Sequence, residues 1–330
     1  MKTYPKWLSA AVLSAMLASP AAALETKAKN VILMDYDTGE YLFAENAFVP
    51  VAPASMSKLM TVYVLFSKLK DGTLSLEDVF SVSENAWRTG GAASGSSTMF
   101  LPIGSKVTVE NLIKGIIIQS GNDACIVAAE NIAGSEEDFA ELMNAKAKEL
   151  GLKNSHFVNS TGLPHPDHRM SAEDLARLAQ ALIRDFPEYY SVFSQKSFTY
   201  NNILQGNRNP LLYSMPDADG LKTGHTAEAG FCLTASVKRG DRRLIGVMTG
   251  LKSNKERSEE AEKLMNWGFR EFNNYKVFKQ FQRIVSVPVY MGEEKSIDLA
   301  VDEDVIMTIA RSKARDVKLT AVYEKPVKAP

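Results

Sequence analysis

The sequence predicts an α+β fold, in which a helical cluster lies beside one antiparallel sheet. Strand patterns occur near the N-terminus and again over residues 220–249, and the long stretch between them has helical periodicity. After about residue 275 the pattern changes to short alternating strands, which is typical of a small all-β domain. We therefore expect a large domain over residues 24–275, with a sheet built from both of its ends, and a short β-rich C-terminal domain over residues 276–330.

The first 23 residues have the pattern of an export signal. Lys2 and Lys6 form a positive start, residues 7–18 (WLSAAVLSAMLA) are apolar, and small residues up to Ala23 form a cleavage site. The alternative is an uncleaved membrane anchor, but that requires about 20 apolar residues and this stretch is shorter. We predict a signal peptide over residues 1–23 and export to a bacterial periplasm, with peripheral attachment to the inner membrane left open.

The other elements follow from local patterns. Residues 31–36 (VILMDY) and 40–44 (EYLFA) flank Asp37-Thr38-Gly39, which predicts a β-hairpin. Helices are expected over residues 56–69, 109–119, 123–133, 136–150, 171–185 and 258–272. Strands are expected over residues 220–226, 231–237 and 243–249 of the large domain, and over residues 283–290, 296–301, 305–310 and 317–323 of the small one.

The composition excludes several classes of function. Of the 330 residues, 38 are Lys or Arg and 39 are Asp or Glu, and a net charge of −1 argues against nucleic acid as the main partner. The two cysteines, Cys125 and Cys232, are too few for a disulfide framework or a four-ligand zinc site. Whether these two cysteines pair depends on the fold.

The first of three chemical motifs is Ser55-Met56-Ser57-Lys58, a Ser-x-x-Lys pattern at the start of the first expected helix. Residues at positions i and i+3 share a helix face, so the Ser55 hydroxyl would lie beside the Lys58 amine. Serine needs a base to become a good nucleophile, and an amine can act as that base only when burial or nearby positive charge keeps it neutral. The motif alone is weak evidence, because Ser67 and Lys70 have the same spacing on an expected solvated helix face.

The second motif is Ser120-Gly121-Asn122, a Ser-x-Asn pattern between two expected helices. Considered alone, it is explained as a helix break in which Asn122 caps the next helix. The same pattern also occurs at Ser83-Glu84-Asn85, which we expect to lie in a loop.

The third motif, Lys222-Thr223-Gly224, occurs once and lies on an expected strand. Glycine at this place would let another backbone approach closely, so that a peptide could add alongside as an extra strand. Lys222 and the Thr223 hydroxyl would then meet a carboxylate. The alternative is an ordinary strand with a surface lysine.

The order and spacing of the motifs carry more weight than any one of them. Ser55 and Ser120 are 65 residues apart, and Ser120 and Lys222 are 102 apart. The competing pair, Ser67 and Ser83, is only 16 residues apart, which leaves no room for a helical lobe between them.

In this order the motifs resemble those of the low-molecular-mass penicillin-binding proteins, the D-alanyl-D-alanine carboxypeptidases of peptidoglycan. The resemblance extends over about residues 31–272, and Gly121 stands where a Ser-Asp-Asn form of the second motif has Asp. Other stretches similar to that family are residues 118–125 (IQSGNDAC), 207–209 (NRN), 222–226 (KTGHT) and 267–269 (WGF).

The resemblance implies a role for each motif residue. Ser55 would be the acylated nucleophile, Lys58 its base, and Ser120 a relay of the proton to the leaving D-alanine. Asn122 would hold the substrate amide and orient Lys58, and the backbone N–H groups of Ser55 and His225 would form an oxyanion hole. The implied substrate-binding residues are Asn122, Lys222, Thr223, Gly224 and His225. The implied substrates are peptidoglycan pentapeptide stems, with β-lactams as acylating inhibitors and no cofactor or metal.

Four other functions remain as alternatives. A serine β-lactamase of class A would carry a deacylating glutamate, and no Glu-x-x-Leu-Asn pattern follows Leu150. An endopeptidase that cuts peptidoglycan cross-links would use the same residues. A metal-dependent carboxypeptidase could be built on His165 and His168, although these lie in a loop without an obvious third ligand. The last alternative is a non-catalytic wall-binding protein.

Two departures from the family pattern bear on attachment and specificity. Relatives commonly have a longer β-rich second domain and an amphipathic C-terminal helix, and this chain ends without such a helix, so we expect either a shortened second domain or a truncated product.

Thr161-Gly162-Leu163 stands where some relatives have His-Gly-Leu. Arg208 and Arg257 are candidates to hold the terminal carboxylate of the substrate, and surface arginine is the alternative for both.

Overall fold

The computed structural model describes residues 24–291, 295–320, 322 and 327–328, so the predicted signal peptide over residues 1–23 lies outside the described residues. The chain divides into two compact units, one formed by residues 25–268 and one by the residues from 269 onward. Among the described residues, the helices are all too short or too polar to span a bilayer.

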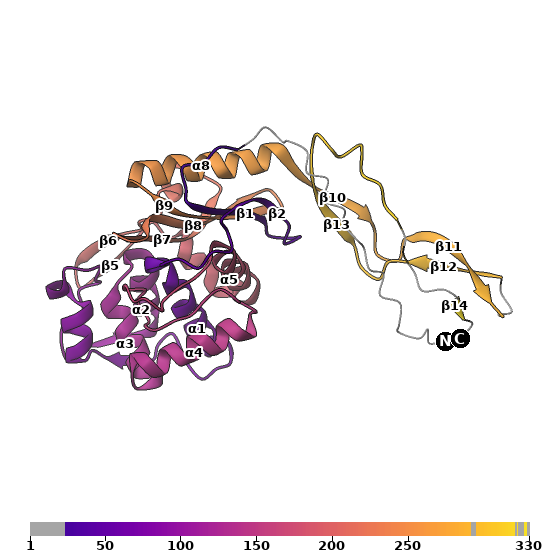
Figure 1. The fold of residues 1–330 in the computed structure, drawn as a ribbon. Coiled ribbons are helices and arrows are strands. Elements are labelled where there is room, and N and C mark those ends of the chain that lie inside the picture. The colour runs from indigo at the N-terminus through magenta and orange to yellow at the C-terminus, as the bar shows by residue number, and fades with distance from the viewer. Residues whose placement is uncertain (1–23, 292–294, 321, 323–326, 329–330) are drawn as a thin grey trace. The chain divides into compact units, whose positions relative to one another are not determined.

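A five-stranded antiparallel sheet organises the first unit (Figure 1). Its strands are β1 (Asn30–Asp35), β2 (Tyr41–Glu45), β7 (Ala218–Thr226), β8 (Gly230–Arg239) and β9 (Arg242–Leu251). Their order in the sheet is β2-β1-β9-β8-β7, so β1 from the start of the unit pairs with β9 from its end. This confirms the predicted α+β class, the predicted hairpin and the predicted sheet built from both ends of the domain. Strand β7 lies at one edge of the sheet.

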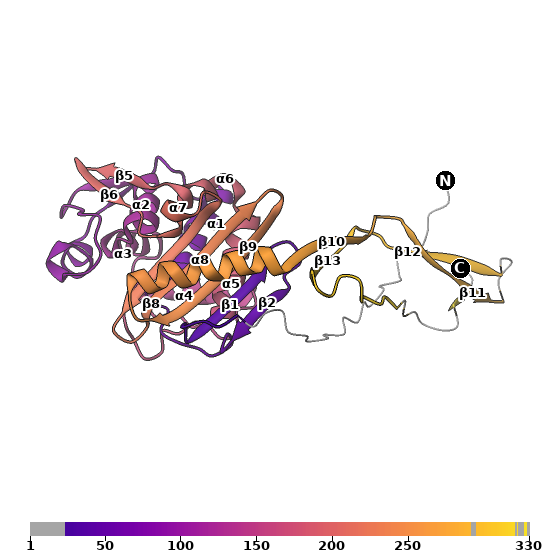
Figure 2. The ribbon, with the colours of Figure 1, turned by 90° about the horizontal axis from the view of Figure 1, so that it is seen from above.

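Helices cover both faces of this sheet. Helix α8 (Asn254–Glu271) lies across one face, and α1 (Lys58–Lys70) and α5 (Ala172–Asp185) lie beneath the other (Figures 1 and 2). The approach of α8 is close, because a Cβ on Gly268 would lie 2.5 Å from Leu33 Cδ2. This helix begins four residues before the predicted residue 258, because the Ser253 hydroxyl accepts from Glu256 N–H and caps it.

The helical cluster agrees with the predicted pattern. Its other helices are α2 (Val109–Lys114), a π-helical turn at Gly115–Gln119, α3 (Asn122–Ala133) and α4 (Glu136–Glu149). Ser135 and Ser171 cap α4 and α5. Each serine hydroxyl accepts a hydrogen bond from the backbone N–H three residues further along, which is why serine is favoured at a helix N-cap. Gly151, which follows α4, has φ of +69°, the left-handed conformation predicted for a glycine after a helix end.

Short elements complete this unit. They are the strands β3 (Val79–Ser81), β4 (Lys106–Thr108), β5 (Ser197–Tyr200) and β6 (Ile203–Gly206), the helices α6 (Pro187–Tyr190) and α7 (Leu211–Ser214), and the turns Ala54–Ser57, Ala86–Gly90, Ala92–Ser94 and Ser191–Ser194. Cys125 and Cys232 are both buried and carry free thiols.

The second unit is built of β-strands, which confirms the all-β prediction. Strand β10 (Phe272–Phe278) pairs with β13 (Val305–Ala310), and β11 (Arg283–Tyr290) pairs with β12 (Ser296–Ala300) and with β14 (Val327–Lys328). Strand β10 was not predicted. The predicted strand over residues 317–323 is wrong for residues 317–320 and 322, which lie outside any strand, because alternation forms a strand only where a partner edge accepts it. Residues 321 and 323 lie outside the described residues.

Candidate active site

The Ser-x-x-Lys motif lies at the junction of a tight turn and a helix. Ser55 is in a single 3₁₀ turn, Ala54–Ser57, which we call the serine turn, and Lys58 is the first residue of α1. The helix expected from residue 56 begins two residues later, at Lys58, and Ser55 lies in the turn directly before it. The predicted proximity is confirmed, because Lys58 Nζ lies 3.0 Å from Ser55 Oγ. Ala54 has φ of +49°, so the serine turn is strained for a residue with a side chain.

Lys58 is fully buried and has three hydrogen-bond partners. Its Nζ donates to Asn122 Oδ1 at 2.7 Å and to the backbone oxygen of Thr161 at 2.5 Å, in addition to Ser55 Oγ. Burial lowers the pKa of Lys58 to about 8. A neutral amine has two N–H groups, and the two carbonyl oxygens can only accept, so its lone pair is left facing the Ser55 hydroxyl. This arrangement can deprotonate a serine.

The second motif lies between two helical segments, as predicted. Ser120 follows the π-helical turn with φ of +65°, and Asn122 begins α3. The Asn122 side chain is 3% exposed, and its Nδ2 donates to Ser96 Oγ at 3.0 Å while its Oδ1 accepts from Lys58. The helix-cap explanation of Asn122 is therefore wrong: Gly121 is the N-cap residue of α3, no side chain caps this helix, and the Asn122 side chain instead contacts Lys58 and Ser96.

The third motif occupies β7, the edge strand, beside the serine turn. Lys222 is buried and its Nζ donates to the Thr223 oxygen at 3.2 Å. Burial lowers the pKa of Lys222 well below its usual value, and the positive charges of Lys58 and Arg208 lower it further. A Cβ on Gly224 would lie 3.0 Å from the Pro53 oxygen, so the backbone that approaches this glycine is that of the segment leading into the serine turn.

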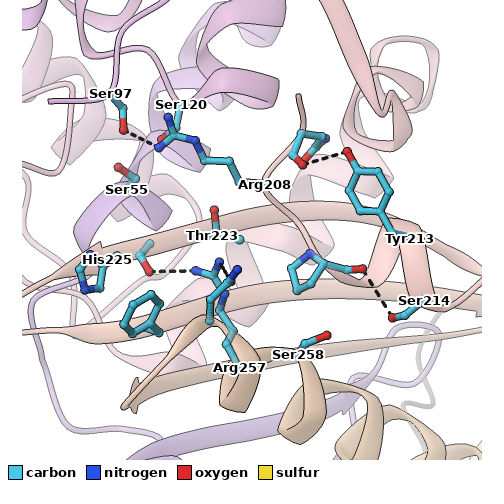
Figure 3. Close-up of a pocket in the computed structure, with 15 residues that line it drawn as sticks. Ser55, Ser97, Ser120, Arg208, Tyr213, Ser214, Thr223, His225, Arg257 and Ser258 are labelled. Carbon is cyan, nitrogen blue, oxygen red and sulfur yellow. Dashed lines mark hydrogen bonds between the residues drawn. The ribbon is translucent and has the colours of Figure 1, made fainter. Parts of the chain in front are cut away.

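These elements enclose one side of a pocket of about 760 Å³ (Figure 3). Its lining residues are Ser55, Ser97, Ser120, Asn207, Arg208, Pro210, Tyr213, Ser214, Thr223, Gly224, His225, Phe231, Asn254, Arg257 and Ser258. Five of the eight predicted site residues line this pocket, and the other three, Lys58, Asn122 and Lys222, are buried behind its wall. The lining contains two arginines and no carboxylate, so the pocket favours an anionic ligand.

The two arginines differ in how they are held. Arg257 is 6% exposed, and its guanidinium donates to the oxygens of Gly224 (3.4 Å) and Cys232 (3.3 Å). Its buried Nε has no hydrogen-bond partner, and burial lowers its pKa to about 10. Arg208 is exposed and donates to Ser97 Oγ at 2.5 Å, across the mouth of the pocket from Thr223 (Figure 3).

The competing patterns have ordinary structural explanations. Ser67 Oγ donates to the Tyr63 oxygen within α1, and Ser83 Oγ donates to Glu130. His168 is buried with both ring nitrogens engaged inside the protein, which leaves none for a metal ion. No group of three or more metal-binding side chains occurs in the described part of the chain.

Sequence reasoning missed three contributors to the site. Thr161 acts through its backbone oxygen, so its side chain carries no signal. Ser96 and Ser97 come from an irregular serine-rich stretch, and only the tertiary structure brings them against Asn122 and Arg208.

The fold and this site define a serine hydrolase whose site lies at the edge of an antiparallel sheet. Family models match residues 16–253, described as D-alanyl-D-alanine carboxypeptidase, and residues 272–330, described as the penicillin-binding protein 5 C-terminal domain. The chain belongs to the D-alanyl-D-alanine carboxypeptidase family.

Individual relatives agree. The D-alanyl-D-alanine carboxypeptidases DacA and DacC of Escherichia coli (strain K12) are 43% and 44% identical to this chain, in each case over 89% of this chain and 74% of the relative. The crystal structure of penicillin binding protein 5 from Haemophilus influenzae superposes with a TM-score of 0.87 at 38% identity, covering 94% of this chain and 91% of the other.

Proposed function

We propose that the protein removes the terminal D-alanine from peptidoglycan pentapeptide stems through an acyl-enzyme on Ser55. The observation that carries this proposal is the 3.0 Å contact between Ser55 Oγ and Lys58 Nζ. The other two partners of Lys58 are carbonyl oxygens, which can only accept hydrogen bonds. The names of the relatives supply the substrate class.

In the first step, neutral Lys58 takes the Ser55 proton while Ser55 Oγ attacks the carbonyl between the two D-alanines. The backbone N–H groups of Ser55 and His225 stabilise the oxyanion of the tetrahedral intermediate. Ser120, which lines the pocket, relays the proton from Lys58 to the departing amine of D-alanine. Water then attacks the ester, and the tetrapeptide leaves with Ser55 restored.

The substrate stem is proposed to lie along β7 as an added strand. This strand has an unpaired edge within the described sheet, and main-chain hydrogen bonds along such an edge are a common mode of peptide binding. Gly224 keeps β7 close to the serine turn, so that a peptide beside His225 would present its carbonyl to Ser55. Thr223 presents its hydroxyl to the pocket, and buried Lys222 lies behind it and donates to the Thr223 backbone oxygen.

Arg257 is proposed to hold the terminal carboxylate of the substrate together with Thr223. Replacing Arg257 with glutamine should lower kcat/KM about 10- to 100-fold for a peptide with a free C-terminal carboxylate, because a charge-assisted hydrogen bond is lost. The same peptide with an amidated C-terminus should be affected little. Lys255→Gln, at an exposed position on the same helix, is the control. An equal loss on both peptides would show that Arg257 acts only through the fold.

The proposed function is tested with two assays on purified residues 24–330. D-alanine release from a peptide ending in D-alanyl-D-alanine is measured, and an intact-mass time course with benzylpenicillin is mapped by peptide analysis. We expect D-alanine release and an adduct on Ser55 that persists for minutes or longer. An adduct lost within seconds would favour a β-lactamase, and no adduct would refute the acyl-enzyme mechanism.

We also propose that the chain is exported and that residues 1–23 are removed. N-terminal sequencing of the protein from the periplasmic fraction of a bacterial host should then begin at Leu24. Full-length protein retained in the membrane fraction would instead support an uncleaved anchor.

A further inference from the structure

His168 makes two hydrogen bonds next to the serine turn, accepting one and donating the other. The ring is 2% exposed, and its Nδ1 accepts from the backbone N–H of Val158 at 3.2 Å. A backbone N–H can only donate, so Nδ1 carries no proton and the neutral ring has its proton on Nε2. This Nε2 lies 2.7 Å from Ser57 Oγ and donates to it. Burial lowers the pKa of His168 to about 4, so the ring keeps this form at neutral pH.

Ser57 stands between the two residues whose distance matters for acylation. It lies in the serine turn with Ser55 on one side and Lys58 on the other, and its side chain is fully buried. No side chain caps the turn, and Ala54 holds a left-handed conformation within it. Such a conformation persists only where surrounding contacts enforce it.

One side of the serine turn is held by Gly224 on β7, and further contacts come from residues 157–168, which we call the support loop. A Cβ on Gly162 would lie 2.1 Å from the Ala54 oxygen, so the loop backbone packs directly on the serine turn. The same loop presents the Thr161 oxygen to Lys58. The support loop is therefore in contact with the serine turn on both sides of Ser55.

The support loop is anchored independently of His168. Glu136, at the start of α4, accepts from Ser160 N–H at 3.2 Å and from Ser160 Oγ at 2.6 Å. Thr61 on α1 donates to the Ser160 oxygen at 2.6 Å. Because these bonds fix the loop, the hydrogen bond between His168 and Ser57 can hold the serine turn in place relative to the loop.

We propose that His168 is a positioning residue for acylation: its hydrogen bond to Ser57 holds the serine turn so that Ser55 Oγ stays within reach of Lys58. Without it the turn relaxes towards an unstrained conformation and the Ser55–Lys58 distance grows. A displacement of about 1 Å at a reacting group can cost about 100-fold in rate. The proposal rests on the proposed acylation of Ser55, and wild-type acylation is measured first so that the two can fail separately.

Two substitutions separate the two bonds of the ring. In His168→Asn the amide oxygen takes the place of Nδ1 and still accepts from Val158, but no group reaches Ser57. In His168→Gln the amide nitrogen takes the place of Nε2 and still donates to Ser57. We expect His168→Asn to lower the rate constant for acylation by benzylpenicillin about 10- to 100-fold. The dissociation constant of the noncovalent benzylpenicillin complex that precedes acylation should change little. His168→Gln should stay within about threefold of wild type.

A double-mutant cycle tests whether the effect passes through Ser57. Ser57→Ala should lose about as much rate as His168→Asn, and the double variant should lose no more than either one. His165→Asn, which changes an exposed ring in the same loop, should acylate at the wild-type rate. If His168→Asn does not fold, as judged by its thermal transition, Ser57→Ala decides, because it leaves His168 in place.

The outcomes are distinct. A wild-type rate in His168→Asn or Ser57→Ala overturns the proposal, and so does His168→Gln as slow as His168→Asn while both are folded. Losses that add in the double variant show that His168 acts by another route and also overturn it. A wild-type protein that is not acylated refutes the proposed function itself, and with it the role of His168.

Discussion

Replacing Ser55 with alanine is expected to abolish the benzylpenicillin adduct and to lower D-alanine release by about 10³-fold or more. Among the three hydrogen-bond partners of Lys58 Nζ in the described part of the chain, the Ser55 hydroxyl is the one that can form an ester, because the other two are carbonyl oxygens. The measurement is the intact-mass time course together with D-alanine release under the same conditions.

Ser67→Ala is the matched control for this experiment. Ser67 has the same spacing to a lysine, but its hydroxyl donates to the Tyr63 oxygen on its own helix. We expect this variant to form the adduct at the wild-type rate. A Ser55→Ala protein that still released D-alanine at a tenth of the wild-type rate or faster would exclude Ser55 as the nucleophile.

The acylation rate of the wild-type protein is expected to rise with pH and to level off above the pKa of Lys58, which burial lowers to about 8. The rate rises with pH because only the neutral amine can accept the Ser55 proton, and the fraction of neutral amine grows as pH passes through that pKa. Lys58→Met should lose about 10²- to 10⁴-fold, the usual contribution of general acid–base catalysis, and the remaining rate should no longer follow this pH dependence.

Lys58→Arg separates the base from the charge. A guanidinium keeps the positive charge but is not deprotonated in proteins, so this variant should be as slow as Lys58→Met. Stopped-flow measurement of acylation from pH 6 to 10 distinguishes the cases. Substantial activity in Lys58→Arg would mean that positive charge, rather than proton abstraction, is what Lys58 supplies.

Much of the fold could be predicted because it is encoded locally. The hairpin at β1 and β2 and the cap at Ser171 depend on neighbours within a few residues, and both agree with the sequence patterns. Errors occur where local pattern and tertiary context disagree. Helix α8 begins at a cap that lies before its apolar pattern, and alternating residues after 317 have no partner strand in the described chain.

The site could be predicted in its residues but not in its geometry. The order of the three motifs indicates which side chains meet, since serine, lysine and asparagine in this order suit acyl transfer. It does not show that Asn122 and the Thr161 oxygen together leave the Lys58 lone pair for Ser55. Nor does it show that Gly224 faces the serine turn, because that contact joins residues 170 positions apart.

By itself, the sequence determined the fold class, most helices and strands, the three motifs and the family they resemble, because periodicity, capping and motif chemistry are read over short distances along the chain. Only the tertiary structure decided that Lys58 is fully buried, that Arg257 and Arg208 face one pocket, and that His168 makes a hydrogen bond with Ser57. These properties arise when β1 pairs with β9 and the sheet closes over the helices, which brings together groups separated by more than 200 residues. Burial, the cause of the lowered pKa of Lys58, exists only once that packing is complete.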